Sequence, residues 1–346
     1  MNKTLRALLT VVCTLGVAAS SILVSHSNAG AKSFKIAIVT KAETISVFQD
    51  VDTGAGVAAK HLGDTFTHTG PSTPDAGKQR DIIVNNLIPQ HPDAIGASAN
   101  DPQVVGAALA QARAKGIKTF SWDSDVTPSS RSVFVNEAPT QAVGALLAKM
   151  ACRDIPACTG QIAILSATTT STNQNAWIAA MKRAMRITRR YHGLHLVKIA
   201  YGNDDPAKST TETQGLLRAY PSLKSIVAPT SVGIVAAAKV VQDNHMKGKV
   251  DVTGLCFAKE MASYIRHGIS KQCALWSFKD LGYLAFYVGH ALAAGTLTGR
   301  VGQTFKAGVL GQRTVQAGGS VILGPLQQYN KSNVGYYIGH GSKCCG

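Results

Sequence analysis

Acidic residues are scarce in this sequence. The 346-residue chain carries 19 Asp and Glu against 35 Lys and Arg, which gives a formal net charge of +16. Aromatic residues make up only 6%, and the basic residues are scattered in short clusters such as residues 181–191. Proteins that bind single-stranded nucleic acid interleave basic and aromatic side chains. The composition therefore argues against a nucleic-acid partner and favours a cationic protein that adheres to anionic envelopes.

The signatures of common enzyme classes are also missing. The sequence has no GxSxG, no HExxH, no Walker A motif and no GxGxxG after a predicted strand. Asp123 and Asp125 could form the acid–base pair of a glycosidase. We expect, however, that only one of them lines a cleft. We expect no catalytic residue and no cofactor.

The N-terminus differs from the rest of the chain. An apolar run at residues 7–24 follows Lys3 and Arg6 and leads to small residues at Ser27 and Ala29. This order predicts a secretory signal peptide over residues 1–29, with cleavage leaving a net charge of +14. A membrane anchor, or a lipoprotein site at Cys13, is the alternative. Because no second long apolar run occurs, we expect the mature chain to be soluble in the periplasm.

Seven cysteines are present, and one of them lies in the predicted signal peptide. In an oxidising compartment disulfides are permitted. A disulfide between Cys152 and Cys158 is plausible, and one between Cys256 and Cys273 is a weaker expectation. Cys344 and Cys345 are adjacent near the end of the chain, and their role stays open. No cysteine or histidine spacing resembles a zinc site, so no structural metal is expected.

Short apolar strands alternate with helical patterns along most of the chain. In the first half, strands are predicted at residues 34–40, 65–71, 93–99, 117–125 and 132–138, with helices at 47–63, 75–90, 101–116 and 139–151. In the second half, strands at 160–167, 194–202, 223–229, 250–256 and 272–278 alternate with helices at 172–188, 205–221, 231–246, 258–268 and 280–295. This α/β alternation predicts two doubly wound, Rossmann-like domains built on parallel sheets.

Ligands of such sheets bind beyond the carboxyl ends of the strands. The residues found there are amides, hydroxyls, a few carboxylates, one lysine and several aromatics. They are Lys41, Glu43, Phe48, Asn100, Asp101, Trp122, Asp123, Ser124, Asp125, Asn173, Gln174, Thr230, Ser231, Cys256, Phe257, Trp276, Ser277 and Asp280. Carboxylates, amides and a lysine can hydrogen-bond sugar hydroxyls, and aromatic faces can pack on the sugar ring. The set therefore favours a sugar ligand.

Several of these residues also have simple structural explanations. Trp122 and Trp276 could be core residues, and Asp101 is expected to cap a helix rather than bind ligand. The hydroxyl-rich segment 168–172 is interpreted as a turn whose threonines and Ser171 cap the helix that follows. Trp177 is expected in the core.

Six segments together resemble a known family. They are "TGPSTPDAGKQRDIIVNNLI" (69–88), "DAIGASANDP" (93–102), "GIKTFSWDSDVTPSSRS" (116–132), "ILSATTTSTNQNAWIAAMK" (164–182), "SIVAPTSVGIVAAAKVVQD" (225–243) and "ALWSFKDLGY" (274–283). The chain is similar to type I periplasmic sugar-binding proteins of ABC transporters. Within that family it resembles the rhamnose-binding branch, which is close to the autoinducer-2-binding proteins.

The resemblance implies two lobes joined by three hinge crossings. The N-terminal lobe would comprise residues 34–136 plus 256–320, and the C-terminal lobe residues 137–255 plus 321–340. The crossings would fall near Asn136, at Leu255–Cys256 and within residues 319–322.

The resemblance also implies a ligand site with no catalytic and no metal-binding residues. The matching positions are Lys41, Phe48, Asp123, Asn173, Gln174, Pro229, Ser231 and Trp276. The sequence departs from the family at Val47, where a second aromatic usually stands, at Ile45 and Ser46, which replace residues such as Gly or Asn, and at Cys256 and Ser277. Because autoinducer-2 binders have Asp at the position of Asn173, the neutral amide favours a deoxysugar.

The implied function is capture of a monosaccharide, rhamnose or a similar deoxyhexose, for an ABC permease in the inner membrane. The protein would be a monomer and not an enzyme. The alternatives are binding of autoinducer-2 or another small polyol, or a sugar sensor that feeds a chemoreceptor or kinase. A transcriptional regulator would need a helix-turn-helix before Phe34, and a secreted hydrolase would depend on Asp123.

Overall fold

The structure is a computed structural model that describes residues 32–345. The predicted signal peptide and Cys13 lie outside the described residues. Among the residues it describes, no helix combines the length and the apolar character that crossing a membrane requires.

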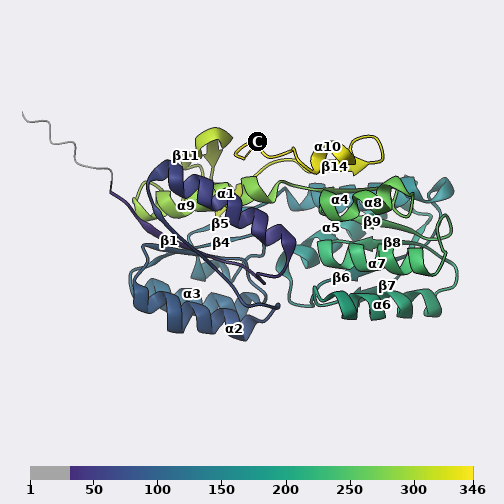
Figure 1. The fold of residues 1–346 in the computed structure, drawn as a ribbon, viewed down its shortest axis with the longest axis horizontal. Helices are drawn as coiled ribbons and strands as arrows, with labels where there is room; N and C mark the ends of the chain where they lie inside the picture. Colours follow the sequence, from purple (N-terminus) through teal and green to yellow (C-terminus); the bar gives the residue numbers. More distant parts are fainter. Residues whose placement is uncertain (1–31, 346) are drawn as a thin grey trace, which may run out of the picture. The chain divides into compact units, whose positions relative to one another are not determined.

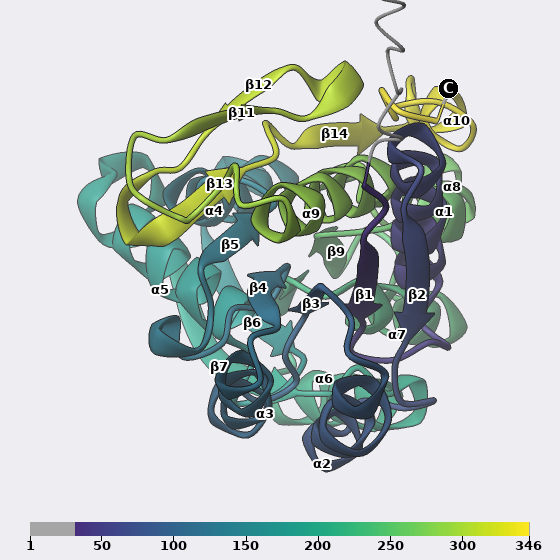
Figure 2. The same ribbon diagram turned by 90° about the vertical axis from the view of Figure 1, so that its left-hand side faces the viewer.

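The first sheet is parallel and has the strand order β13-β5-β4-β3-β1-β2. Its strands are β1 (Lys35–Val39), β2 (Thr65–Thr69), β3 (Ala94–Ala97), β4 (Lys118–Trp122), β5 (Val133–Asn136) and β13 (Ser320–Ile322). Helices α1 (Ser46–Leu62) and α9 (Phe278–Ala293) cover one face, and α2 (Ala76–Asp81) and α3 (Pro102–Ala114) cover the other (Figures 1 and 2). The central strand β3 is buried along its whole length because helices pack on both faces.

The second sheet is also parallel, with the order β7-β6-β8-β9. Its strands are β6 (Gly160–Ser166), β7 (Leu194–Tyr201), β8 (Leu223–Ala228) and β9 (Asp251–Gly254). Its helices are α4 (Thr140–Asp154), α5 (Thr172–Ile187), α6 (Pro206–Ala219), α7 (Ser231–Asp243) and α8 (Ala258–Arg266). The predicted α/β fold with two doubly wound sheets is confirmed.

Two strands near the end of the fold correct the expected division into lobes. Strand β10 (Gln272–Leu275) pairs antiparallel with β14 (Gln327–Asn330), and a parallel bridge joins Ala274 to Leu255 beside β9. Residues 256–275 therefore pack with the second sheet, whereas the resemblance implied that they belong to the first lobe. The prediction was wrong here because a strand–helix–strand pattern does not reveal which sheet the returning strand joins.

The strand pairing supports a revised division, which we propose. The first lobe would comprise residues 33–136 and 278–322, and the second lobe residues 140–275 and 327–337. The crossings would then lie after Asn136, at Trp276–Ser277 and at residues 323–326. The first and third crossings are joined, because the N–H groups of Leu323 and Gly324 donate to the carbonyls of Asn136 and Glu137 at 2.8 and 3.2 Å.

The N-terminal ends of α3 and α5 test the predicted helix caps. Asp101 caps α3, since one carboxylate oxygen accepts from the N–H groups of Gln103 and Val104 at 2.9 Å each. Ser171 occupies the cap position of α5, but its side chain makes no capping hydrogen bond. Within the first turn of α5, the N–H of Gln174 instead donates to the side-chain oxygen of Asn173 at 2.8 Å. The expected capping role of Ser171 was therefore wrong.

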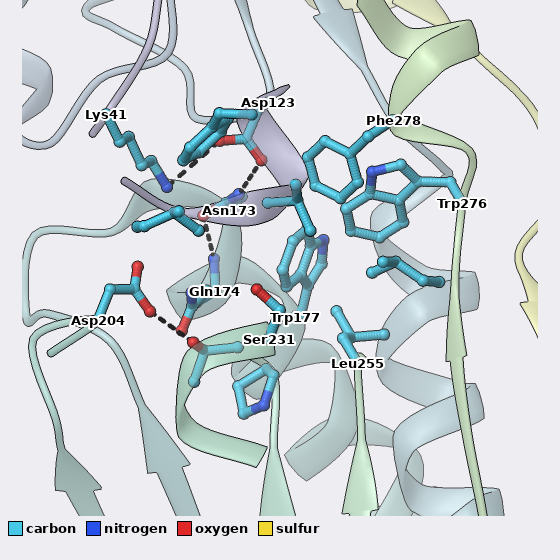
Figure 3. A pocket seen from close by; sticks show the side chains of 16 residues that line it. Lys41, Asp123, Asn173, Gln174, Trp177, Asp204, Ser231, Leu255, Trp276 and Phe278 are labelled. Carbon is cyan, nitrogen blue, oxygen red and sulfur yellow. Dashed lines mark hydrogen bonds and ion pairs between the residues drawn. The ribbon is translucent and has the colours of Figure 1, made fainter. Parts of the chain in front are cut away.

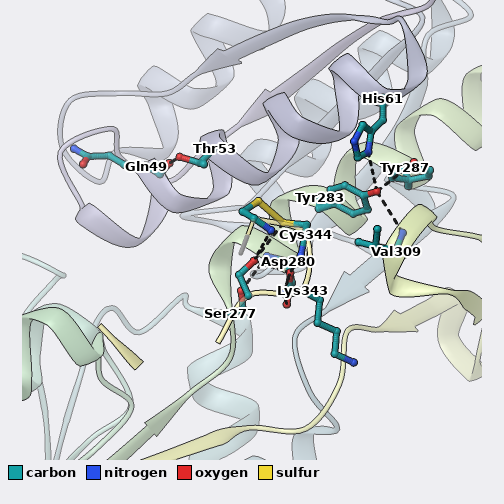
Figure 4. Close-up of a disulfide and its surroundings, with 12 residues drawn as sticks. Gln49, Thr53, His61, Ser277, Asp280, Tyr283, Tyr287, Val309, Lys343 and Cys344 are labelled. Carbon is teal, nitrogen blue, oxygen red and sulfur yellow. Dashed lines mark hydrogen bonds between the residues drawn. A yellow bond between two sulfur atoms is a disulfide. The ribbon is translucent and has the colours of Figure 1, made fainter. Parts of the chain in front are cut away.

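The chain ends in a tail that binds back onto α9 (Figure 4). After the hairpin of β11 (Thr304–Lys306) and β12 (Gln312–Thr314), the chain passes through β14 and α10 (Val334–Tyr337). The hydroxyl of Ser342 and the N–H groups of Lys343 and Cys344 then donate to the Asp280 carboxylate at 2.8–3.0 Å. Because α9 packs on the first sheet and β14 pairs in the second lobe, the tail connects the two lobes.

All six described cysteines form disulfides. Cys152 pairs with Cys158 and Cys256 with Cys273, as the sequence suggested, with Cα–Cα distances of 4.4 and 5.8 Å. Adjacent Cys344 and Cys345 form the third disulfide, in the tail.

Candidate ligand-binding site

A cavity lies where the carboxyl ends of strands from both sheets meet (Figure 3). All eight residues expected in the ligand site line it: Lys41, Phe48, Asp123, Asn173, Gln174, Pro229, Ser231 and Trp276. Trp177, expected in the core, is buried and also lines the cavity, whereas Trp122 is fully buried outside it. The structure brings the predicted residues together, and their contact with a ligand remains a prediction.

One wall of the cavity is polar and centres on Asp123. The Lys41 ammonium lies 3.4 Å from its Oδ2 atom, and the Ser98 hydroxyl donates to the same oxygen at 2.5 Å. Both members of the ion pair are buried. Asp123 has φ 56°, a left-handed conformation that is uncommon outside glycine and that clusters at functional sites. The turn after β4 thus holds a carboxylate at the cavity.

Asp125, two residues further on, points elsewhere. It forms a two-pronged ion pair with Arg131, with both nitrogen–oxygen distances at 2.6 Å. The expectation that only one of the two carboxylates lines the cleft is confirmed.

The second lobe contributes the start of α5. Asn173 donates from Nδ2 to the Asp123 carboxylate at 3.1 Å, and its oxygen accepts from the Ser124 hydroxyl at 3.2 Å. Gln174 uses its side-chain oxygen to accept from Ser166 and from the N–H of Ala167, at 2.9 and 2.8 Å. Asn173 therefore bridges the two lobes, while Gln174 fixes the start of α5 against the end of β6.

Glu137 contacts the site without lining the cavity, and it was not predicted from the sequence. It is fully buried at the first crossing, and its Oε1 atom lies 3.4 Å from the Asn173 amide nitrogen. Burial raises its pKa well above the ordinary value, and the neighbouring Asp123 carboxylate raises the pKa further. A neutral, protonated Glu137 can donate a hydrogen bond to Asp123, whereas two adjacent buried charges would repel.

Asp204 was also missed. It follows β7, lines the cavity and accepts from the Thr230 hydroxyl at 2.5 Å. Burial raises its pKa, while the Lys41 ammonium and the Thr230 hydrogen bond oppose that rise. The rule that pointed to the other strand ends applies equally to the strand at residues 194–202 and would have identified Asp204.

The opposite wall is apolar. It is formed by Ile45, Val47, Phe48, Trp177, Leu255, Leu275, Trp276 and Phe278. The rings pack on one another: the Trp276 ring centroid lies 5.5 Å from that of Trp177 and 5.7 Å from that of Phe278. The indole N–H of Trp276 is buried without a hydrogen-bond partner. An unpaired buried donor costs free energy, so this N–H is well placed to donate to a ligand.

The hydroxyl-rich segment before α5 contacts the first lobe. Thr170 donates to the carbonyl of Asn100 at 2.9 Å, and Thr172 donates to the carbonyl of Asp125 at 3.1 Å. With Asn173, these side chains form a set of hydrogen bonds between the lobes at the rim of the cavity, which we call the threonine latch.

The arrangement can bind a small neutral molecule that carries both hydroxyl groups and an apolar face. The polar wall offers amide and ammonium groups as hydrogen-bond donors and carboxylate groups as acceptors. It therefore suits hydroxyls, which both donate and accept hydrogen bonds. The lining holds two carboxylates, Asp123 and Asp204, against one lysine, which disfavours an anionic ligand. Among the described residues, no group of three or more His, Cys, Asp or Glu side chains could hold a metal ion.

Comparison with known protein families identifies the family of this chain. Residues 36–297 match the periplasmic binding protein domain. The chain therefore belongs to the periplasmic binding protein family, which confirms the resemblance seen in the sequence. Its relatives are solute-binding proteins of sugar ABC transporters, and this chain is likewise a solute-binding protein rather than an enzyme.

Solved structures of relatives share the fold. An ABC transporter solute-binding protein from Clostridium phytofermentas with bound L-rhamnose is 35% identical, with a TM-score of 0.84, covering 89% of this chain and 98% of that one. A sugar ABC transporter protein from Actinomyces odontolyticus is 35% identical, with a TM-score of 0.71 and coverage of 88% and 99%. LsrB from Clostridium saccharobutylicum in complex with AI-2 has a TM-score of 0.81 with coverage of 87% and 99%, but at 22% identity it supports the fold alone.

Proposed function

We propose that this protein captures a neutral deoxyhexose, with L-rhamnose the favoured ligand, between its two lobes and delivers it to the permease of an ABC transporter. The observation that carries the proposal is the two-sided cavity. Its polar wall combines Lys41 and Asp123 from one lobe with Asn173 from the other, and its opposite wall is aromatic and aliphatic. A 6-deoxyhexose matches both walls, because it presents hydroxyls on its ring and a methyl group where other hexoses carry a hydroxymethyl.

The size of the cavity implies that the lobes must separate for binding. Its volume is about 50 Å³, far below the roughly 300 Å³ or more of typical ligand pockets. A sugar therefore enters an opened form and is then enclosed, and its contacts with both lobes favour closure. In this mechanism the ligand takes over part of the bridging that Asn173 provides here, while the threonine latch is kept in the closed form.

The cellular setting follows from the family and the N-terminal sequence. We propose that residues 1–29 direct secretion, that the mature protein is a periplasmic monomer, and that the closed, loaded form docks on an inner-membrane permease. No chemical step on the sugar is involved, so none of the perturbed carboxyl groups needs to act as an acid or base.

Thermal unfolding with a panel of candidate ligands tests this proposal. The panel contains L-rhamnose, L-fucose, D-arabinose, autoinducer-2 and a hexose phosphate. A ligand that binds only the folded protein raises the melting temperature in proportion to the logarithm of its concentration relative to Kd. We expect the largest shift with L-rhamnose and no shift with the phosphate. A larger shift with autoinducer-2, or none with any sugar, would overturn the assignment.

A further inference from the structure

Positive charge is concentrated in one part of the second lobe. Between Asp154 and Asp204 the sequence contains no acidic residue but six Lys or Arg. Three of these, Arg186, Arg189 and Arg190, stand at the end of α5 and in the turn after it, and all three are exposed. The turn is held against the helix by His192, whose Nε2 atom lies 3.0 Å from the carbonyl oxygen of Arg186.

The topology carries further basic residues to the same edge. Helix α5 starts at the ligand cavity and ends at the opposite edge of the sheet, where the parallel strands begin. A depression of about 520 Å³ is lined there by residues at the end of α4, at the start of β8, before β9 and before β10. Exposed Lys224, Lys249 and Lys271 surround it.

A second depression continues this surface. It has a volume of about 610 Å³, shares Gly268 with the first, and has no acidic residue in its lining. Its charged and titratable side chains are His245, Lys247, Arg266, His267 and Lys331. The α5 turn adjoins the first depression through Gly193, whose carbonyl accepts from Gly160, next to Thr159 in the lining. These residues form one surface, which we call the basic end face.

The acidic groups near this face are outnumbered by its basic groups. Asp154 and Asp251 lie side by side within the first depression, and burial raises the pKa of both carboxyls. Asp243 is paired with Lys239 at 2.8 Å. Attraction to the carboxyl ends of helices explains a basic residue in a last turn. It does not explain Lys224, Lys249 and Lys271, which stand next to strand starts.

An exposed apolar side chain lies within the charge cluster. Ile187 is 67% exposed, the highest value among the large hydrophobic residues described as exposed, and it stands between Arg186 and Arg189. Basic side chains around an exposed aliphatic residue are the combination that binds at a lipid headgroup layer, where phosphates meet the charges and the apolar group enters the boundary.

We propose that the basic end face binds the surface of an anionic phospholipid membrane. The charges are spread over a broad surface rather than gathered around one enclosed pocket, which suits a fluid array of headgroups better than a single small anion. The face lies at the opposite edge of the sheet from the ligand cavity, so membrane binding leaves the ligand-binding residues untouched. The inference is independent of which sugar the cavity holds.

Vesicle co-sedimentation tests the proposal on the mature chain. Vesicles of phosphatidylcholine with and without phosphatidylglycerol are compared at low and high salt. The variant Arg186→Gln/Arg189→Gln/Arg190→Gln removes three charges from the basic end face. The matched control Lys60→Gln/Lys115→Gln/Lys118→Gln removes three exposed charges from the corresponding strand-start edge of the first sheet.

We expect binding only to the anionic vesicles, with loss at high salt. The arginine variant should bind roughly 100-fold more weakly, given the usual contribution of each basic side chain near an anionic surface, and the lysine control should change much less. Thermal unfolding with sugar should be unaltered in both variants. Equal losses in the two variants would overturn the proposal, as would equal binding to neutral vesicles. Binding to soluble polyphosphate or to purified permease, without binding to anionic vesicles, would also overturn it.

Discussion

Asp123, Glu137 and Asn173 form one buried cluster at the site, in which Asp123 and Asn173 line the cavity. Two of these side chains are carboxyls in a buried setting, and the third is an amide that reaches both of them at 3.1 and 3.4 Å. The group is stable only when one carboxyl is neutral, because the Lys41 ammonium compensates one buried negative charge but not two. Glu137, whose pKa is raised well above its ordinary value, is the carboxyl that keeps its proton.

This protonation makes stability depend on pH through Glu137. Because the pKa of Glu137 is raised in the folded protein, its stabilising contribution to the free energy of unfolding is fully present at pH values below its ordinary pKa of 4.5. That contribution is lost as the pH rises through the folded-state pKa. Glu137→Gln keeps a donor toward Asp123 but cannot ionise. We expect the variant to gain stability relative to the natural chain with rising pH, by about 1–3 kcal/mol. Thermal unfolding across a pH series measures this, and parallel profiles for the two proteins would contradict it.

The indole N–H of Trp276 should contribute to sugar binding. Its buried indole N–H has no partner, and the side chain lines the cavity. Trp276→Phe keeps an aromatic ring but removes the donor, so the sugar Kd should rise about 3–10-fold, the usual effect of one neutral hydrogen bond. Trp122→Phe is the matched control, since its N–H also has no partner but the side chain lies outside the cavity. Equal Kd values for Trp276→Phe and the control would refute the assigned role.

Seven of the eight predicted cavity residues follow strand ends, because parallel strands carry their carboxyl ends to one edge of the sheet. Pro229, and the choice of these eight among the strand-end residues, came from the family resemblance. Asp204 follows from the same rule and was overlooked. Glu137 does not follow from it, since it lies in a crossing and its direction depends on how the two lobes meet. The neutral state of Glu137 depends on its burial beside Asp123, which no local pattern shows.

At the scale of elements, the hydroxyl density before α5 has a structural explanation. Thr170 and Thr172 do not cap the helix but donate to carbonyls of the first lobe. Sequence reasoning assigned these hydroxyls to a local turn, because Ser and Thr before a helix most often serve as caps. Only the packing of the two lobes shows that the partners lie in loops after β3 and β4.

The threonine latch should therefore stabilise the closed form. Thr170→Val/Thr172→Val keeps the shape of both side chains and removes two hydrogen bonds between the lobes. We expect the sugar Kd to rise about tenfold, mainly through faster dissociation. Stopped-flow release of the sugar measures this. Thr169→Val, whose exposed hydroxyl has no such partner, is the control, and unchanged release from the double variant would show that the latch has no part in closure.

The C-terminal tail is held by Asp280. Three donors converge on this buried carboxylate, and hydrogen bonds to a charged acceptor are stronger than neutral ones. Asp280→Asn should lower the free energy of unfolding by about 1.5–3 kcal/mol.

A chain that ends at residue 341 provides the control for this prediction. The shorter chain lacks the three hydrogen-bond donors of the tail. Asp280→Asn should therefore lower the free energy of unfolding less in that chain than in the full-length protein. Chemical unfolding of the four variants gives the comparison. An equal cost in both backgrounds would mean that Asp280 acts through other contacts.

At the scale of the whole molecule, the alternation of strands and helices predicted the fold class, but the assignment of residues 256–275 to the first lobe was wrong. The run from β9 through α8 to β10 has the same local pattern wherever it packs. Its position follows from the antiparallel pairing with β14 and from the disulfide between Cys256 and Cys273. Long-range pairing of this kind is decided by the folded chain and not by periodicity.

We expect the two-sided cavity to enclose a 6-deoxyhexose. Calorimetric titration with L-rhamnose and with L-mannose checks this, because the two sugars differ by one hydroxyl at C6. L-rhamnose should bind, and L-mannose should bind about 10–100-fold more weakly, since the added hydroxyl would be buried against the apolar wall without a partner. Equal affinity for the two sugars, or no heat with L-rhamnose, would rule out enclosure of a 6-deoxyhexose.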